Sequence, residues 1–190
     1  SDVYKSQQLS PRVLVAEGLM CGSSEHHMRH PGTLTLRPGT FLAALGDMIE
    51  SMPRAGFRNV VVVNGHGGNI EPIHGTWDQF LRQFEGINLH FLSYWDTLYQ
   101  ADANELLLGG KCLPDDLPGH AQEFETSFAL AKFPENVRDE AVSDQSDPSP
   151  ALATAEQGNE WFDRVTERLA KFVGEVIDGQ RQSEIPPFHP

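Results

Sequence analysis

Residues 60–69, which read VVVVNGHGGN, give the clearest indication of the fold. Four consecutive valines that end in an asparagine and a glycine-rich turn are typical of a strand buried on both faces of a sheet. Residues 12–19 (RVLVAEGL) and 88–95 (NLHFLSYW) are short apolar runs of the same kind. We therefore predict three short strands, with the one that ends at Asn64 as the second along the chain.

Amphipathic helical patterns separate these predicted strands. Residues 40–54 carry apolar side chains at spacings of three and four, with Thr40 as the expected N-cap, and residues 69–84 repeat the pattern. Strand, helix, strand, helix and strand at these intervals are typical of right-handed βαβ units. We therefore predict an α/β fold with a mostly parallel sheet flanked by helices. Two further helices are expected at about residues 120–132 and 153–178.

Length and composition favour a single domain over residues 1–190. Of these residues 39% are hydrophobic, which is enough for a sizeable core. The 14 Lys and Arg residues against 27 Asp and Glu residues give a net charge of -13. A field of that sign repels phosphate backbones and anionic membrane surfaces, so we expect no nucleic-acid partner and no membrane partner.

Cysteine content and the length of apolar runs bear on the compartment. Cys21 and Cys112 are too few for a disulfide framework and lack CxxC spacing, which favours the reducing cytoplasm. No apolar run approaches the roughly 20 residues that a spanning helix needs, and the first residues do not form a signal-peptide pattern. We therefore expect a soluble, cytoplasmic protein.

His66 is the first candidate functional residue, because it follows directly after the second predicted strand. Ligands in open α/β sheets bind outside the carboxyl ends of the strands, and the glycines on both sides leave the imidazole uncrowded. One alternative is a turn that happens to hold a histidine. Another is the phosphate-binding turn of a nucleotide-binding module, although the full G-x-G-x-x-G spacing and the P-loop lysine are missing.

The second group of candidates lies in residues 119–127, which read GHAQEFETS. A carboxylate such as Glu123 in a first helical turn is favoured by the macrodipole, so ordinary capping explains it. His120 at the same helix end should stay neutral and remain available as a base or ligand. If this imidazole and a carboxylate are brought beside His66, they form an N/O set that zinc or manganese accepts.

The third group lies in residues 22–36, which read GSSEHHMRHPGTLTL and contain Glu25, His26, His27 and His30. Three histidines within five residues are compatible with a metal site, a proton relay or a polar surface loop, and the sequence favours none of the three. Trp95 closes the third predicted strand, where it forms either a pocket wall or part of the core.

Taken in order and at these separations, the motifs GSSEHHMRHPGTLTL, VVVNGHGGN, LSYWD and GHAQEFETS resemble those of the creatininase family of metal-dependent amidohydrolases. The resemblance covers residues 13 to about 134. It implies a flavodoxin-like, three-layer fold assembled as a hexamer of identical subunits. It also implies two divalent metals, bridged by an aspartate and a water, and the cleavage of C–N bonds in cyclic or small linear amides.

The resemblance assigns metal ligands at His66 and Glu125 and a general acid/base at His120. The implied mechanism is metal activation of water to hydroxide, attack on the amide carbon, and protonation of the leaving nitrogen by His120. An earlier family motif, roughly G-S-x-E-x-H-G-x-H-L-P followed by an aspartate, has no match in this sequence, and Asp2 is the candidate for the bridging aspartate. We expect one or two ions per subunit, with zinc as the first choice and manganese or iron as alternatives.

The same resemblance places Trp95 in the substrate pocket, with His27 and Gly67 as further substrate contacts. By this resemblance, creatinine-cleaving members carry an aromatic residue and a glutamate directly after the histidine of the NGH motif. They also carry a tryptophan four residues before the second histidine, which corresponds to His120 here. This sequence has Gly67, Gly68 and Asp116 at those positions. We therefore expect a small amide other than creatinine, such as a formamide or lactam attached to a heterocycle or a modified peptide.

The sequence thus predicts a metal-dependent hydrolase that cleaves a C–N bond of a small, non-peptide amide. An alternative is a non-catalytic ligand-binding or assembly subunit of the same fold, because the earlier metal-binding motif is missing from these 190 residues. The expected partners are the small amide and further copies of the chain.

Overall fold

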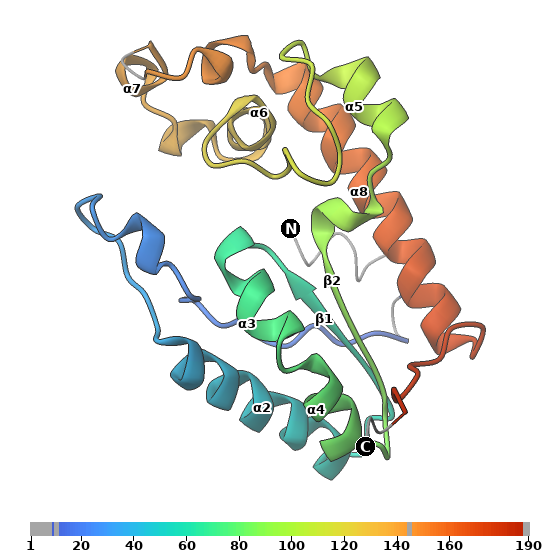
Figure 1. Cartoon of the computed structure of the whole chain (residues 1–190). Helices are drawn as coiled ribbons and strands as arrows, with labels where there is room; N and C mark the ends of the chain where they lie inside the picture. The colour runs from blue at the N-terminus through green and yellow to red at the C-terminus, as the bar shows by residue number, and fades with distance from the viewer. Residues whose placement is uncertain (1–8, 10–11, 144–145, 188–190) are drawn as a thin grey trace. The chain divides into compact units, whose positions relative to one another are not determined.

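The computed structural model describes residue 9 and residues 12–143 and 146–187 (Figure 1). The chain forms two compact units. Unit 1 comprises Ser1–Ser93 and Lys171–Pro190, and unit 2 comprises Tyr94–Ala170. Asp2 lies outside the described residues. The expectation of a single domain stays a prediction.

Unit 1 is built around two parallel strands, β1 (Asn59–Asn64) and β2 (Asn88–Ser93). The strands pair over their whole length, from Asn59 opposite Asn88 to Asn64 opposite Ser93. Figure 1 shows the helices that connect them, which follow a short 3-10 turn, η2 (Gly67–Asn69). This strand-helix-strand crossover confirms the predicted α/β class, and the carboxyl ends of both strands meet at Asn64 and Ser93.

The connection between the strands contains two helices, α3 (Ile70–His74) and α4 (Trp77–Gln83). The prediction of one continuous helix over residues 69–84 is therefore wrong, because two shorter helices occupy this range. The first helix ends at Gly75, whose N–H bonds the Glu71 carbonyl, and the chain turns before the second begins. Gly75 stays in the right-handed helical region, with φ of -65°, and glycine is a poor helix former, which favours a break at this position.

The core of unit 1 lies between these helices, α2 (Pro38–Arg54) and the strands. The helix at residues 40–54 is confirmed, but its N-cap is Arg37 and not Thr40, because Pro38 occupies the first helical position. Proline suits that position since its missing N–H has no helical partner there. The buried apolar side chains of the core are Phe41, Leu45, Ile49, Ile73, Phe80, Leu81, Phe84, Ile87 and Leu89.

The structure contradicts the predicted strand at residues 12–19. Residues 13–19 have no regular secondary structure, and Leu14 and Val15 are 75% and 49% exposed. An apolar, β-branched run becomes a strand only when a neighbouring strand accepts and donates its backbone hydrogen bonds. In the described part of the chain, β1 and β2 pair only with each other, so this run has no strand partner.

Unit 2 is helical. Its central helix α6 (Glu123–Lys132) packs Phe124 edge-to-face on Trp161 of α8 (Ala155–Ile177), with ring centroids 5.0 Å apart. Gly158 permits this approach, since a Cβ there would lie only 1.9 Å from the Ser127 carbonyl oxygen. The remaining elements are η3 (Tyr94–Thr97), α5 (Gln100–Leu106), η4 (Pro134–Asn136), α7 (Asp139–Ser143) and η5 (Ser149–Leu152).

The long C-terminal helix predicted at residues 153–178 is confirmed as α8, and its last residues belong to unit 1. Although α8 has 23 residues, the described chain contains no helix that is both long and apolar enough to cross a membrane. Charged side chains are spread along α8, and several of them enter the ion cluster of unit 2.

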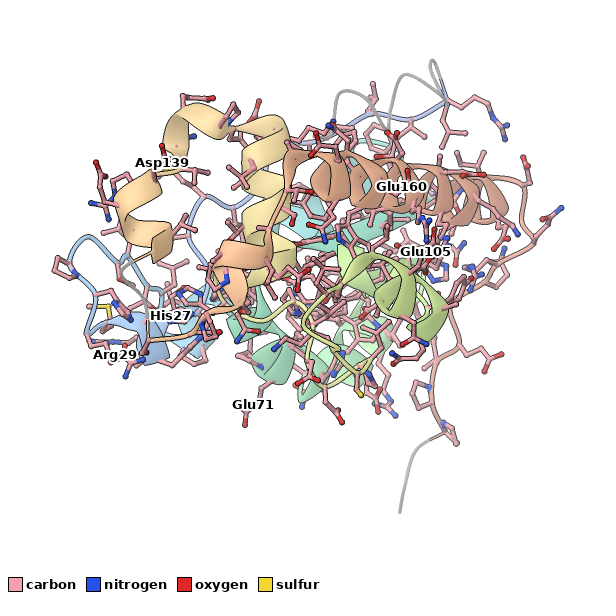
Figure 2. All side chains as sticks on the ribbon, turned by 90° about the horizontal axis from the view of Figure 1, so that it is seen from above. His27, Arg29, Glu71, Glu105, Asp139 and Glu160 are labelled. Atoms are coloured by element: carbon pink, nitrogen blue, oxygen red, sulfur yellow. The ribbon has the colours of Figure 1, made fainter. Side chains whose placement is uncertain are left out.

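An ion cluster around the buried Asp102 ties α5 to α8 within unit 2. Asp102 is 4% exposed and binds Arg168 at 2.6 and 2.9 Å and Arg164 at 2.8 Å. Arg164 also binds Glu105 on α5 and Glu160 on α8, both labelled in Figure 2. Burial alone would raise the pKa of Asp102, but hydrogen bonds from Arg168, the Tyr99 N–H and Arg164 lower this pKa to about 2.

Candidate metal and active site

Asn64, the last residue of β1, holds the turn that carries His66. Its side-chain oxygen accepts hydrogen bonds from the His66 N–H and from the Asn69 side chain, both at 3.1 Å. Its amide group donates to the His66 carbonyl at 2.9 Å and to Ser93 Oγ at 3.0 Å. Because Asn64 is 4% exposed, these bonds are shielded from water, and they fix the backbone on both sides of the imidazole.

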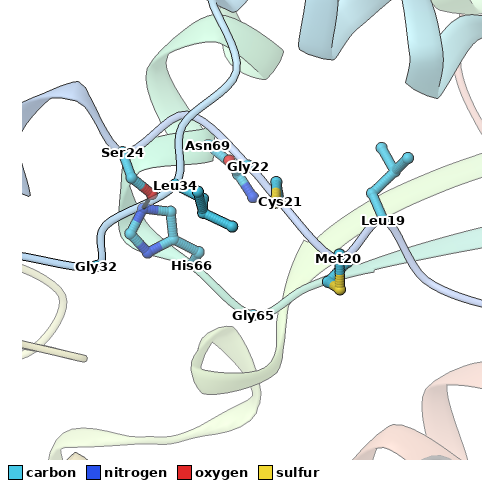
Figure 3. Close-up of a pocket in the computed structure, with 10 residues that line it drawn as sticks. All are labelled: Leu19, Met20, Cys21, Gly22, Ser24, Gly32, Leu34, Gly65, His66 and Asn69. Carbon is cyan, nitrogen blue, oxygen red and sulfur yellow. Dashed lines mark hydrogen bonds between the residues drawn. The ribbon is translucent and has the colours of Figure 1, made fainter. Parts of the chain in front are cut away.

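The loop at residues 22–30 closes over this turn. Asn69 accepts a hydrogen bond from the Ser23 N–H at 2.9 Å. The His66 ring nitrogen Nε2 lies 3.0 Å from Ser24 Oγ and 3.1 Å from the Ser23 carbonyl oxygen. Figure 3 shows His66 and Ser24 side by side. The ring is therefore oriented by two oxygen atoms of a segment about 40 residues away in the sequence.

Three imidazoles meet at this point of unit 1. His26 and His27, on the 3-10 turn η1 (Glu25–His27), and His66 each offer a ring nitrogen, and these atoms lie within 4.8 Å of one another. The ring centroids of His26 and His27 are 3.9 Å apart, and those of His66 lie 5.7 and 5.9 Å from them. Imidazole nitrogens are common ligands of zinc and other transition metals, so this donor set fits a divalent cation.

A pocket of about 490 Å³ opens beside His66 (Figure 3). This volume lies in the range of small-molecule sites, which is about 300–1,000 Å³. Exposed apolar side chains of Leu34 and Met20 contribute to its wall, together with polar groups of Ser24 and Asn69. The described lining residues are Leu19, Met20, Cys21, Gly22, Ser24, Gly32, Leu34, Gly65, His66 and Asn69.

Glu123 in unit 2 has a more specific role than helix capping. Its side chain is fully buried, and its two oxygens accept the N–H groups of Leu108 at 2.8 Å and Gly109 at 2.9 Å. Gln157 on α8 donates a third hydrogen bond at 3.1 Å. A carboxylate with these partners holds the chain after α5 in place, so Glu123 serves the structure of unit 2.

His120 and Glu125 lie on either side of the start of α6. His120 is exposed and precedes the helix, so the prediction of helix from residue 120 is wrong by three residues. The reason is a sharp turn, in which Gly119 and Ala121 have φ angles of 73° and 48°. Burial raises the pKa of Glu125, although the Ala121 N–H bonds its carboxylate at 2.8 Å and opposes the shift. Burial and the Glu125 charge together raise the pKa of Tyr94.

The predicted site residues divide between the two units. Trp95 is 5% exposed and packs edge-to-face on Tyr94, with ring centroids 4.8 Å apart. Unit 1 brings His27 beside His66, and sequence reasoning gave His26 no separate role, although the adjacent pair of histidines was visible. The residues in unit 1 are His66, His27 and Gly67, and those in unit 2 are His120, Glu125 and Trp95.

The positioning amides of Asn64 and Asn69 were missed by sequence reasoning. Their signal is present, since the two asparagines flank the NGHGGN turn on either side. Asparagine side chains commonly hydrogen-bond the backbone of the turns in which they lie. The turn sequence therefore contains both the histidine and the two asparagines whose side chains hold its backbone in place.

Comparison with known protein families gives a match to the creatininase family model, described as creatinine amidohydrolase, over residues 3–151. This range is most of the chain. The chain belongs to the creatininase family. The resemblance noted from the four sequence motifs is thereby confirmed.

Two relatives are identical to this chain at about a third of the aligned residues. The creatinine amidohydrolase of Pseudomonas putida is 33% identical over 146 residues, which are 74% of this chain and 50% of that protein. The 3-dehydro-scyllo-inosose hydrolase of Thermotoga maritima is 31% identical over 121 residues, 63% of this chain and 37% of that protein. The chain thus spans half the length of the first relative and less of the second.

Solved creatininase structures have the same fold. A crystal structure of creatinine amidohydrolase superposes with a TM-score of 0.76 at 26% identity and covers 90% of this chain and 78% of that one. A structure described as creatininase Mn gives 0.77 at 25% identity, with the same coverage. A creatininase variant described as Zn-Zn type gives 0.66 at 27% identity and covers 77% of this chain and 67% of that one. The family fold predicted from the sequence is therefore confirmed.

Proposed function

We propose that this chain carries the activity of a metal-dependent hydrolase that cleaves a C–N bond in a small, non-peptide amide. Membership of the creatininase family and the creatinine amidohydrolase relative support the reaction class. The observation that carries the proposal is the imidazole cluster around His66, which lies beside a small-molecule pocket. Neighbours described as Mn and Zn-Zn creatininases support a divalent metal.

Each proposed ligand offers a donor atom that suits zinc, manganese or iron. His66 offers a ring nitrogen and Glu125 a carboxylate, and Asp2 is the proposed bridging carboxylate. A bound divalent cation supplies Lewis-acid activation of water and of the amide carbonyl. The Asn64 and Ser24 contacts of His66 orient its ring before any cation binds, so little ordering is needed on binding.

His120 is the proposed general acid/base. Its ring nitrogen takes the proton that the attacking water loses and returns a proton to the leaving amide nitrogen. His120 is exposed and lies in the tight turn that precedes α6, where a substrate can reach its imidazole. Trp95, His27 and Gly67 are the proposed substrate contacts.

The proposed substrate is a formamide or lactam attached to a heterocycle or a modified peptide, and not creatinine itself. Gly67 and Gly68 follow His66 directly, so these positions can contact a substrate only through their backbone and lack the aromatic and glutamate side chains expected for creatinine cleavage. The relative named as an inosose hydrolase supports a substrate range wider than creatinine, since an inosose is a cyclic polyol ketone. We also propose that the protein acts in the cytoplasm as a homo-oligomer, a hexamer by family resemblance.

Metal analysis combined with an amide panel tests the proposal. The purified protein should contain near-stoichiometric zinc, manganese or iron and should hydrolyse at least one small formamide or lactam. His66→Ala should lose most of the metal, whereas His120→Ala should keep it and turn over about 10²–10⁴-fold more slowly. His74→Ala, at an exposed histidine of α3 outside the cluster, is the control. A metal-free wild-type protein, or a fully active His120→Ala variant, would contradict the proposal.

A further inference from the structure

We infer that His26 and His27 complete, together with His66, an all-nitrogen site for one zinc ion in unit 1. The inference names further ligands for the cation of the proposed hydrolase, and it rests on that function only for the chemistry that the ion performs. In the proposed function the metal ligands are His66, Glu125 and Asp2, and the inference replaces the substrate contact proposed for His27 with a ligand role. The geometry that supports the site lies wholly within unit 1.

The spacing of the three imidazoles is close to that of a zinc site. Their ligand atoms lie within 4.8 Å of one another, whereas two nitrogens bonded tetrahedrally to one zinc ion at about 2.0–2.1 Å lie about 3.4 Å apart. A contraction of up to about 1.5 Å therefore completes the site. His26 is exposed and His27 is half-buried, on a one-turn segment, so small side-chain rotations supply this movement.

Gly68 is the residue that makes the close approach possible. A Cβ at this position would lie 2.1 Å from the Ser23 carbonyl oxygen, 2.6 Å from His26 Cε1 and 2.6 Å from His66 Nε2. Any side chain at position 68 would therefore displace the loop or one of the two imidazoles. His26 can approach His66 this closely only because residue 68 has no Cβ.

The chemistry of the donors selects the metal. The cluster consists of imidazoles alone, without a carboxylate. Neutral nitrogen ligands suit zinc, copper, iron and nickel, whereas manganese and magnesium prefer oxygen ligands. Three histidines around zinc also leave the fourth tetrahedral position open, as in catalytic zinc sites. Because the site lies beside the pocket at His66, the open position can receive a small molecule.

Metal titration of the whole chain tests the inference without an activity assay. The chain is stripped with a chelator and titrated with Co²⁺, followed by visible absorption, and then with Zn²⁺ and Mn²⁺ by calorimetry. We expect tetrahedral Co²⁺ absorption, tight Zn²⁺ binding and Mn²⁺ binding weaker by about 100-fold or more. His26→Ala and His27→Ala should each lower the zinc affinity by about tenfold or more, which is at least about 1.4 kcal/mol.

Two glycine variants extend the test to the geometry. Gly68→Ala removes no ligand but should lower the zinc affinity by about tenfold, because the added Cβ displaces His26 or His66. Gly67→Ala is the matched control, since a Cβ there meets no heavy atom within 4 Å and should leave the zinc affinity unchanged. Circular dichroism and thermal unfolding of the metal-free variants establish that each is folded, and His27→Gln replaces His27→Ala if the latter unfolds.

The outcomes separate this inference from the proposed function. If His66→Ala abolishes zinc binding while His26→Ala and His27→Ala bind as the wild type does, the three-histidine site is wrong and the hydrolase proposal stands. If all three histidine variants lose zinc but the wild type cleaves no amide, the site stands and the hydrolase proposal is wrong. A wild-type chain that binds no zinc, or that prefers Mn²⁺, overturns the inference.

Discussion

Unit 1 holds the His66 imidazole with neutral amides and hydroxyls, whereas unit 2 holds its buried carboxylates with arginines and backbone N–H groups. Asn64, Asn69 and Ser24 form the hydrogen bonds that hold His66 and its turn, and none of them adds a charge. In unit 2 the charge of Asp102 is matched by two guanidinium groups. The two units thus hold buried polar side chains by different means, through neutral hydrogen bonds at the end of β1 in unit 1 and through charge pairing between α5 and α8 in unit 2.

The largest effect is expected at the ion cluster of unit 2. Asp102→Ala should lower the free energy of unfolding by about 4 kcal/mol, because Arg164 and Arg168 are left without the buried carboxylate between them. Urea denaturation measures the change. Glu105→Ala is the control, since this exposed carboxylate binds the same Arg164. A loss at Glu105 equal to that at Asp102 would show that burial does not distinguish the two carboxylates.

A smaller effect is expected at the glycine beside His66. Gly68→Ala should lower the free energy of unfolding by about 3 kcal/mol, because the Cβ overlaps the Ser23 carbonyl oxygen and two imidazoles. Gly67→Ala should change it by less than about 1 kcal/mol. Thermal unfolding of the metal-free proteins gives both values. Equal stability of the two variants would mean that the loop at residues 22–30 does not pack on the turn.

The amide at the end of β1 comes next. Asn64→Ala should cost about 2 kcal/mol, because the buried turn loses the hydrogen bonds that fix both backbone groups of His66. Asn59→Ala, at the exposed other end of the same strand, should cost less. Urea denaturation of the two variants in parallel decides whether the amide network contributes as the structure indicates.

The smallest effect is a pH dependence from Asp102. Its pKa falls from 3.8 to about 2 on folding, so its stabilisation is complete above about pH 4 and is lost as the pH falls through about 2. We expect a contribution on the order of 1–2 kcal/mol in that window. Unfolding free energies of the wild type and Asp102→Asn at pH values from about 5 to 2 measure it. The wild type should lose more stability on acidification than the variant, and parallel curves would contradict the assignment.

The sequence predicted those elements of the fold that depend on local pattern. The strand Asn59–Asn64 follows from a run of four valines, and the helices Pro38–Arg54 and Ala155–Ile177 follow from apolar periodicity. The run at residues 12–19 has an equally good strand pattern but no pairing partner in the described chain, and pairing is a property of the neighbour. Periodicity also gave no warning of the break at Gly75, which lies inside an otherwise regular apolar stripe.

The candidate site could be predicted in its parts but not in its arrangement. His66 was identified because it follows a strand, and the loop histidines because they crowd one segment. That His26 and His27 approach His66 across about 40 residues of sequence depends on tertiary contacts of Ser23 and Asn69, which no local pattern encodes. The same holds for Asp102 and its arginines, which lie more than 60 residues away along the chain.

Gly158 provides a way to move the carboxylates of α6 without changing them. The backbone of α8 touches the Ser127 carbonyl at this glycine, so an alanine there would act as a wedge between two helices of unit 2. Glu123 and Glu125 lie on the helix that would be displaced. A Gly158→Ala variant would therefore shift the two glutamates while keeping both carboxylates. Replacing either glutamate directly removes the carboxylate and cannot test its position.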